Sequence, residues 1–254
     1  MRAEGSRRRR TSPARRLRPF WLLAALAIVL AGSGFYALAR WPALYPHAIE
    51  VSGNRVVSRE AILAAARIDP QRNIWLQSAR AMQTRIEAIP YVDVAKVHRL
   101  PPSTISIAIT ERVPYAFIDD VQQPNRRVTI DHAGRILQAG APPELVNSLP
   151  AFALPLASVQ PGVFIGAETA PLESVADALL GANLDARRLA FDRFGDVVVT
   201  LRSGVQVLLG DRTVMLGQKI AMVEPILEKV DRGRRKVAAI DLRAPTTPVV
   251  VYAK

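Results

Sequence analysis

The feature that most constrains this chain is an uncharged apolar stretch near its start. Residues 19–39 read PFWLLAALAIVLAGSGFYALA and lie between Arg18 and Arg40 without one charged side chain. A helix rises about 1.5 Å per residue, so about 20 residues span about 30 Å, the thickness of the hydrocarbon core of a bilayer. We therefore predict a transmembrane helix over residues 19–40.

Aromatic side chains mark both ends of this stretch. Trp21 lies at one edge, and Tyr36 and Trp41 lie at the other, as aromatic residues do where a helix crosses the membrane interface. The side chains that we expect to form the membrane anchor are Phe20, Trp21, Leu22, Leu23, Leu26, Ile28, Val29, Leu30, Phe35 and Tyr36.

A cleaved signal peptide is the competing interpretation of the same stretch. Residues Ala37, Leu38 and Ala39 have the small-x-small form of a cleavage site. The apolar run is, however, longer than the roughly 7–15 residues of a signal-peptide core. The length favours an anchor, and an N-terminal tag that stays on the mature protein would decide between the two.

The basic charge of the chain is concentrated before this helix. Residues 1–18 hold eight arginines and one glutamate (8 − 1 = +7), out of a net charge of +12 for all 254 residues. Positive residues beside a transmembrane helix stay in the cytoplasm. We therefore predict a single-pass, type II protein of the cell inner (cytoplasmic) membrane, with its C-terminal part outside the cytoplasm. The arm lacks interleaved aromatic residues, so we interpret it as a topology signal near anionic lipid and expect no nucleic-acid partner.

The residues give no positive indication of catalysis. The chain has no cysteine, which excludes disulfides, thiol catalysis and cysteine metal sites. His47, His98 and His132 lack the spacing of metal ligands, and the glycine-rich nucleotide-binding and nucleophile-elbow motifs are missing. We predict no enzyme activity, no cofactor and no metal. We expect Asp119 and Asp120 in a solvated loop and Asp131 at a turn.

The periodicity of residues 48–110 predicts a small folded unit. A strand over 48–52 is followed by a helix capped by Ser58, a helix capped by Ser78, and strands over 92–100 and 103–110. A slip of the apolar phase near Ala95 suggests a bulge. Two helices packed on one face of a three-stranded sheet would bury the apolar side chains of this unit.

The rest of the chain predicts a mostly antiparallel sheet with helices against one face, so the fold class is α+β. Residues 141–161 are proline-rich and are predicted as a surface loop, and Pro225 is expected to kink or shorten its helix. The predicted helices cover 171–180 and 216–227, and the predicted strands cover 115–118, 127–130, 135–137, 190–192, 197–201, 205–209, 237–241 and 248–252.

An ordered set of short sequence motifs, here called words, resembles motifs of the FtsQ/DivIB family of bacterial cell-division proteins. The words that resemble its POTRA domain are Val51–Asn54, Val57–Glu60, Ile89–Val92, Ala95–Val97, Leu100–Ile105 and Glu111–Pro114, and those that resemble its distal domain are Asp131–Gly134, Leu208–Gly210, Lys219 and Ile240–Arg243. The resemblance implies a basic cytoplasmic arm (1–18), the transmembrane helix (19–40), a β-α-α-β-β POTRA domain (46–114) and an FtsQ-type β domain (115–254).

The resemblance also implies a function. Proteins similar to FtsQ are essential-type scaffolds that recruit and link divisome proteins at the septum, and their partners include FtsB-like and FtsL-like proteins, other divisome membrane proteins and membrane lipid. The alternative is a membrane-anchored chaperone or substrate-binding module with a POTRA domain and no part in division. An outer-membrane translocator would need many more alternating strands after the first unit.

The last strand is the candidate docking site for such a partner. An edge strand offers unpaired backbone groups to a second chain, whereas an interior strand buried on both faces would be equally apolar. The resemblance favours the edge, implies that Arg243 pairs with an acidic partner residue, and loosely matches Arg193 as a second positive charge. Ala244 stands where many relatives carry an aromatic residue. The predicted partner-binding residues are Arg193, Arg243, Ala244, Val249, Val250, Val251 and Tyr252.

Overall fold

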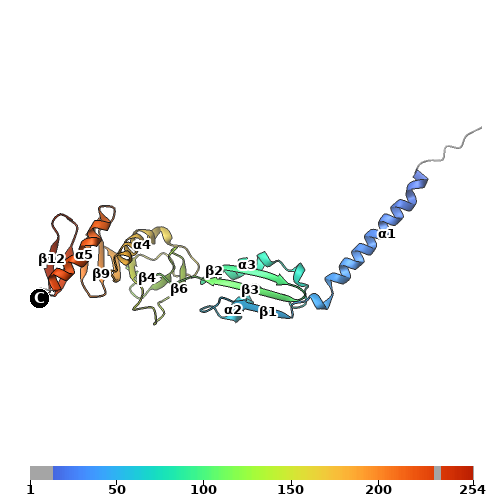
Figure 1. Cartoon of the computed structure of the whole chain (residues 1–254), viewed down its shortest axis with the longest axis horizontal. Coiled ribbons are helices and arrows are strands. Elements are labelled where there is room, and N and C mark those ends of the chain that lie inside the picture. The colour runs from blue at the N-terminus through green and yellow to red at the C-terminus, as the bar shows by residue number, and fades with distance from the viewer. Residues whose placement is uncertain (1–13, 232–235, 254) are drawn as a thin grey trace, which may run out of the picture.

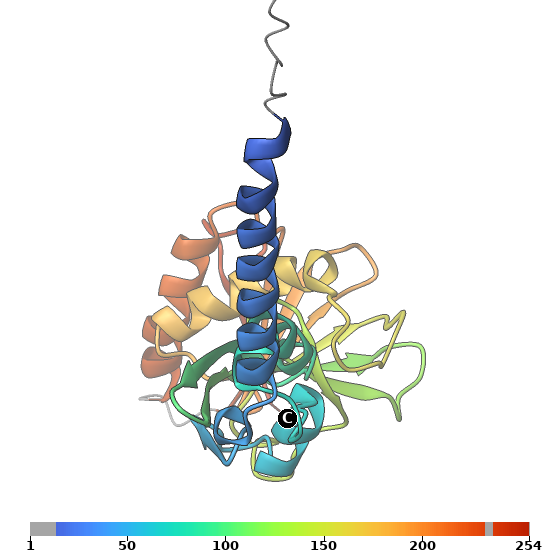
Figure 2. The ribbon, with the colours of Figure 1, turned by 90° about the vertical axis from the view of Figure 1, so that its right-hand side faces the viewer.

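The computed structural model describes residues 14–231 and 236–253 as an elongated chain of one long helix and two sheets (Figure 1). Most of the predicted basic arm, residues 1–13, lies outside the described residues. Viewed from the end that carries the long helix, the two sheets lie one behind the other (Figure 2).

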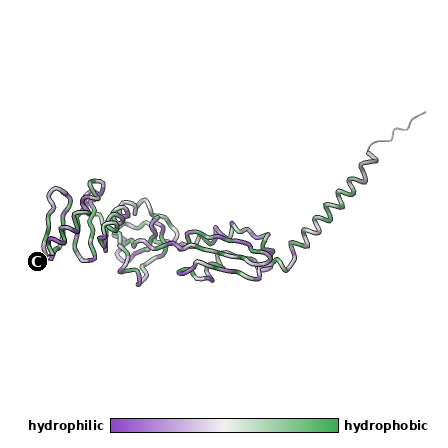
Figure 3. Tube along the Cα trace, in the orientation of Figure 1, coloured by the Kyte–Doolittle hydropathy of each residue, from purple (hydrophilic) through white to green (hydrophobic). Residues whose placement is uncertain are grey.

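The long helix α1 covers Ala14–Ala39, so it begins five residues before the predicted start at residue 19. Its segment Phe20–Ala39 has 20 residues and is long and apolar enough to cross a membrane. Figure 3 shows the hydrophobic residues that run along this helix. None of this segment is buried against the rest of the protein, which is consistent with a single-pass membrane anchor.

The first sheet contains three strands in the order β1-β3-β2. Its elements are β1 (Ala48–Ser52), α2 (Arg59–Ala66), the short 3-10 helix η2 (Ile74–Leu76), α3 (Ala79–Glu87), β2 (Val92–Leu100) and β3 (Thr104–Glu111), and a further 3-10 helix η1 (Pro42–Leu44) joins them to α1. β1 runs parallel to β3 and β2 runs antiparallel to it. The bulge lies between Val92 and Val94, slightly before the predicted position at Ala95.

Local sequence signals account for this unit. The side chains of Ser58 and Ser78 accept hydrogen bonds from Ala61 N–H and Ala81 N–H, both at 3.2 Å, which confirms the two predicted helix caps. Apolar residues of both helices pack against alternating isoleucines of β3. The fully or almost fully buried side chains of this core include Ile62, Met82, Ile86, Ile105 and Ile107.

The second sheet contains nine strands in the order β12-β11-β10-β9-β8-β7-β4-β5-β6. The strands are β4 (Ala116–Asp120), β5 (Arg127–Ile130), β6 (Ile136–Ala139), β7 (Ala151–Leu154), β8 (Ala186–Phe191), β9 (Val197–Leu201), β10 (Gln206–Gly210), β11 (Val237–Asp241) and β12 (Val249–Tyr252). Five of the eight neighbouring pairs are antiparallel, and β4–β7, β7–β8 and β10–β11 are parallel.

Three details of this sheet differ from the sequence prediction. Strand β7 lies inside the segment 141–161 that was predicted as a loop, and it is an interior strand with three of its four residues buried. Helix α4 (Gly166–Gly181) starts five residues before the predicted Pro171. Helix α5 (Leu216–Asp231) continues six residues beyond Pro225, so this proline does not end the helix.

Both helices lie against the same face of the nine-stranded sheet. Helix α4 packs on β7 and β8, α5 packs on β10 and β11, and the two helices contact each other. One continuous apolar core joins the helices to the strands, from Ile130 near one end of the sheet to Ile240 near the other. Strand β12 contributes no buried residue to this core.

Candidate partner-docking edge

Strand β12 is the edge strand of the nine-stranded sheet. It pairs antiparallel with β11, and its register places Val249 opposite Asp241 and Val250 opposite Ile240. Within residues 14–231 and 236–253, no strand pairs with its other side. The sequence left two alternatives open, an edge strand and an interior strand. In the structure β12 is an edge strand.

The backbone of Val250 faces away from the sheet. The N–H of Ala253 donates a hydrogen bond of 2.9 Å to Lys236 O on the side of β11. Backbone groups point alternately to the two sides along an antiparallel strand, so Val251 also bonds towards β11 and Val250 points outward. An outward N–H and C=O at an edge are the groups to which a further strand can bond.

The side chains of β12 expose apolar surface at this edge. Val249 and Val251 share one face, and their exposed fractions are 56% and 49%. Tyr252 is 43% exposed and Val250 is half-buried. An exposed β-branched strand of this kind suits the side-chain pockets or cross-strand pairs of a partner strand.

Arg243 lies two residues after the end of β11, in the segment that leads to β12. Its Nη2 lies 2.6 Å from Asp241 Oδ2, its Nε donates to Asp241 Oδ1 at 3.0 Å, and this hydrogen bond holds the pKa of Asp241 below its usual value. The stem of Arg243 packs over Gly210, where an added Cβ would lie 3.0 Å from Arg243 Cγ. Arg243, the arginine that the resemblance implies for partner binding, is therefore already paired within its own chain. Among the described residues its Nη1 has no hydrogen-bond partner, so this nitrogen is the one available to an acidic partner.

Arg193 lies at the same end of the sheet, in the turn between β8 and β9. Its Cζ is 4.7 Å from the ring centroid of Phe194, whose side chain is 71% exposed. The carboxylates of Asp192 and Asp196 in this turn act electrostatically on Arg243. The structure therefore brings the Arg193 turn and Arg243 to the same end of the second sheet, although 49 residues lie between them in the sequence.

Ala244 is exposed and begins the turn that leads from β11 to β12. Its carbonyl accepts a hydrogen bond from Thr247 N–H at 3.1 Å. The small side chain leaves the space beside Arg243 without an aromatic group.

The predicted membrane-anchor residues all lie on α1 and are remote from the β12 edge in Figure 1.

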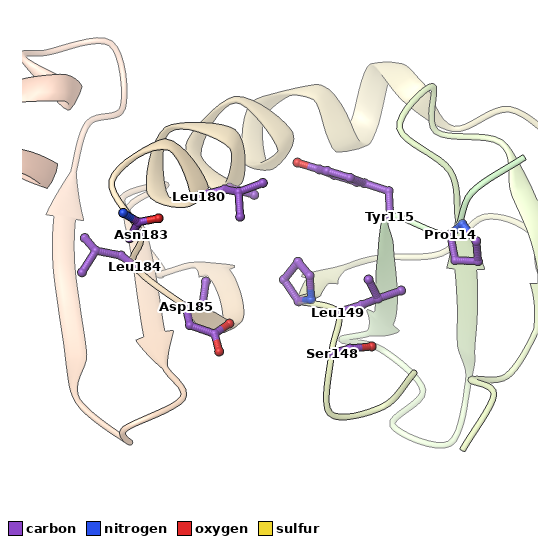
Figure 4. A pocket seen from close by; sticks show the side chains of 11 residues that line it. Pro114, Tyr115, Ser148, Leu149, Leu180, Asn183, Leu184 and Asp185 are labelled. Atoms are coloured by element: carbon purple, nitrogen blue, oxygen red, sulfur yellow. The ribbon is translucent and has the colours of Figure 1, made fainter. Parts of the chain in front are cut away.

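Sequence reasoning did not find an apolar pocket of about 380 Å³ on the second sheet (Figure 4). Tyr115 and Leu149 line one side of it, and Leu180 and Leu184 line the other. Leu180 is 72% exposed at the C-terminal end of α4. Only the parallel pairing of β4, β7 and β8 brings these residues together, so no local sequence pattern marks the pocket.

The acidic residues considered for catalysis have structural partners. Asp119 and Asp120 lie on β4 and not in a solvated loop as predicted, because β4 pairs with β5 and β7. Arg127 and Arg188 form ion pairs with Asp119, and Arg126 forms one with Asp120. Asp131 is buried at its predicted turn. Among the described residues, no group of three or more histidine, aspartate or glutamate side chains is placed to hold a metal.

Two family models match the chain in the order of its two sheets. The POTRA domain, FtsQ-type, matches residues 46–112, and the Cell division protein FtsQ/DivIB C-terminal domain matches residues 121–243. The chain belongs to the FtsQ/DivIB family. The resemblance, the α+β fold and the POTRA domain predicted from the sequence are confirmed. The match to the FtsQ/DivIB C-terminal model ends at Arg243, so β12 lies beyond it.

Individual FtsQ proteins are similar over different lengths. The chain is 35% identical to cell division protein FtsQ of Syntrophotalea carbinolica over 117 residues, or 43% of this chain and 42% of that protein. It is 29% identical to FtsQ of Mycobacterium tuberculosis over 204 residues (79% and 62%) and 28% identical to FtsQ of Xanthomonas campestris over 232 residues (88% and 76%). Against the first relatives, the match therefore spans between 42% and 62% of their length.

Proposed function

We propose that this FtsQ/DivIB-family chain is a divisome scaffold whose β12 edge docks an FtsB-like or FtsL-like partner. The observation that carries the proposal is the open side of β12, with the Val250 backbone directed outward and Val249 and Val251 exposed. A partner segment added as a tenth strand would satisfy these backbone groups and cover the valines.

Charge completes the proposed site. An acidic partner residue beside the end of the added strand would meet Arg243 Nη1, with Arg193 as a second positive charge in the turn between β8 and β9, at the same end of the sheet. An exposed arginine–carboxylate pair is worth little, but a desolvated one at an interface is worth considerably more. The pair therefore contributes most when the partner covers Arg243 from water.

The proposed location follows from α1. This helix would cross the inner membrane with its basic N-terminal side in the cytoplasm, so both sheets would lie outside the cytoplasm. The division septum is the location that membership of the family suggests. The POTRA domain, close to the membrane, would then be available to other divisome membrane proteins, while β12 lies at the distal end.

Co-purification of the partner with full-length variants tests this proposal. Arg243→Glu reverses the charge beside the edge, and Val250→Pro removes an outward N–H without removing a bond to β11. Both variants should lose most of the FtsB-like partner. Arg187→Glu, an exposed arginine on β8, is the matched control and should retain it. Equal partner recovery from all three folded variants would refute docking at this edge.

The alternative, a chaperone or substrate-binding module, is favoured by one observation, the apolar pocket beside Leu180. Depletion of the protein separates the two functions, because division predicts filamentous cells and the alternative predicts normal septation with envelope defects. Leu180→Glu would place a charge in the pocket wall. Rescue of division by this variant, with failure of rescue by Arg243→Glu, would assign the division role to the edge and not to the pocket.

A further inference from the structure

An exposed apolar surface lies at the end of the first sheet that adjoins α1. We call it the membrane-proximal patch and define it by Trp75 and Leu76, whose exposed fractions are 48% and 41%. In η2, Ile74 is fully buried and anchors the turn, so that the two following side chains project outward. Exposed tryptophan and leucine side chains grouped in this way indicate a binding surface.

A hydrogen bond fixes the depth of this patch relative to α1. The side-chain amide of Asn73 donates to Leu38 O at 3.2 Å, and Asn73 is only 4% exposed. Leu38 belongs to the last turn of the segment that is long enough to cross a membrane. Trp75, two residues after Asn73, therefore lies at the level at which α1 would leave the hydrocarbon core.

Arginine side chains accompany the aromatic residues at this level. The Cζ of Arg99 lies 5.2 Å from the ring centroid of Trp75, and its Nη1 donates to Trp75 O at 3.3 Å. At the end of α1, the Cζ of Arg40 lies in the same way 4.9 Å from the ring centroid of Tyr36. Aromatic rings with adjacent cations suit the membrane interface, where rings contact acyl chains and cations contact phosphates.

A hollow of about 300 Å³ lies beside the patch and carries positive charge. Arg67, Arg72 and Arg85 line it together with one acid, Asp69. Arg85 is used within the chain, since it donates to Ala65 O and Ala66 O. Arg67 and Arg72 are exposed, so both guanidinium groups are available for a phosphate.

We propose that the membrane-proximal patch rests on the outer leaflet of the bilayer, with Trp75 and Leu76 at the acyl-chain boundary and an anionic phospholipid headgroup in the arginine-lined hollow. Figure 1 agrees with this orientation, because α1 rises towards the side of the first sheet on which α3 lies, and the hollow includes the start of α3. The inference depends on α1 spanning the bilayer and is independent of the division role.

Fluorescence quenching in nanodiscs tests this inference on the full chain. Trp21, Trp41 and Trp75 are the three tryptophans of the sequence, so W21F/W41F leaves Trp75 as the reporter. In discs that contain phosphatidylglycerol and lipids brominated near the headgroup, Trp75 should lose intensity and shift to shorter wavelength. A matched control, W21F/W41F/W75F with Phe194→Trp, places the reporter on the distal sheet and should be unaffected.

A second reporter distinguishes contact of the membrane-proximal patch with the bilayer, here called the seating, from insertion of the α1 anchor into the bilayer. In W21F/W75F, Trp41 reports the end of α1. Quenching of Trp41 without quenching of Trp75 would overturn the seating while α1 still spans the disc, and the absence of quenching at both would overturn the anchor as well. Because the bromine atoms are carried by the lipids and the discs hold no divisome partner, contact with a protein partner cannot produce the quenching.

Charge reversal tests the headgroup. Adding Arg67→Glu and Arg72→Glu to the Trp75 reporter should reduce quenching in phosphatidylglycerol discs and change it little in phosphatidylcholine discs. Equal quenching of the unreversed reporter in both lipids, with no effect of the reversal, would overturn the anionic headgroup assignment.

Discussion

Arg112 Nη1 donates to Asp131 Oδ2 at 2.8 Å, which joins the end of the first sheet to a turn of the second. Nη2 of the same guanidinium lies 3.0 Å from Asp93 Oδ1. The other oxygen of Asp131 accepts from the N–H groups of Ala133 and Arg135 and so holds the turn. One guanidinium therefore connects both sheets through a buried carboxylate, which favours the extended arrangement in Figure 1.

Arg112→Ala should loosen the junction between the sheets. Removal of the guanidinium leaves Asp131 buried without its charge partner, which costs about 2 kcal/mol. The chain has no cysteine, so spin labels at Lys96→Cys and Arg187→Cys can report the distance between the sheets. The distance distribution should broaden in Arg112→Ala and stay unchanged in the control Arg202→Ala, which removes an exposed ion pair. An unchanged distance distribution in Arg112→Ala would contradict the role of Arg112 in holding the two sheets together.

Glu111→Gln should weaken the first sheet most at neutral pH. Burial alone would raise the pKa of Glu111, but hydrogen bonds from the N–H groups of residues 55–57 outweigh it and lower this pKa. A carboxylate with a lowered folded pKa stabilises above its unfolded pKa, and this contribution disappears as the pH falls through the folded value.

The expected loss for Glu111→Gln is about 1 kcal/mol at pH 7. Urea unfolding in detergent, repeated as the pH is lowered through 4, measures the difference from the unmodified chain, which should vanish at the acid end. Glu50→Gln, an exposed glutamate on β1, should behave like the unmodified chain throughout. A loss that is the same at every pH would exclude the ionised carboxylate as its cause.

Short-range sequence signals predict most elements of the first sheet. They predict fewer elements of the second sheet. Caps at Ser58 and Ser78 and the alternation of Ile105 and Ile107 act within a few residues, so they predict elements correctly. Strand β7 has only four residues, and parallel neighbours distant in sequence define it. Its flanking prolines therefore outweighed its apolar residues in the prediction.

Glu173→Gln should stabilise the second sheet near neutral pH. Burial raises the pKa of Glu173, and its Oε1 lacks a hydrogen-bond partner among the described residues. A raised folded pKa means that stability decreases as the pH rises from the unfolded pKa through the folded value. The amide removes this loss, so we expect a gain of about 1 kcal/mol at pH 7 and none at pH 4. Thermal unfolding should show no such gain for Glu224→Gln on α5, and a less stable Glu173→Gln at pH 7 would refute the argument.

Lys219→Met should destabilise the attachment of α5 to the sheet. Lys219 is 1% exposed, and its Nζ donates to Leu209 O at 2.6 Å and to Asp211 O at 3.0 Å. Methionine fills similar space but leaves both carbonyls without this donor, at a cost of about 2 kcal/mol. Urea unfolding should show this loss, whereas Lys229→Met, an exposed lysine of the same helix, should change little. Equal stability of the two variants would contradict the role of Lys219.

The candidate edge was only partly predictable. Three consecutive valines suit an edge strand and a buried interior strand alike, so Val250 could be assigned to the edge only from the strand order. The pair between Arg243 and Asp241 follows the end of β11, and the two residues are two positions apart, which is a local signal that sequence reasoning did not use. The proximity of Arg193 to this end depends on long-range pairing of β8 to β11 and has no local signature.

Hydrogen exchange of the β12 amides, measured on the full chain with and without its FtsB-like partner, tests docking at this edge most directly. The account predicts that the partner slows exchange of the Val250 amide, because this N–H points outward and becomes bonded only in the complex. Unchanged exchange over residues 249–252, with protection appearing elsewhere on the second sheet when the partner binds, would contradict it.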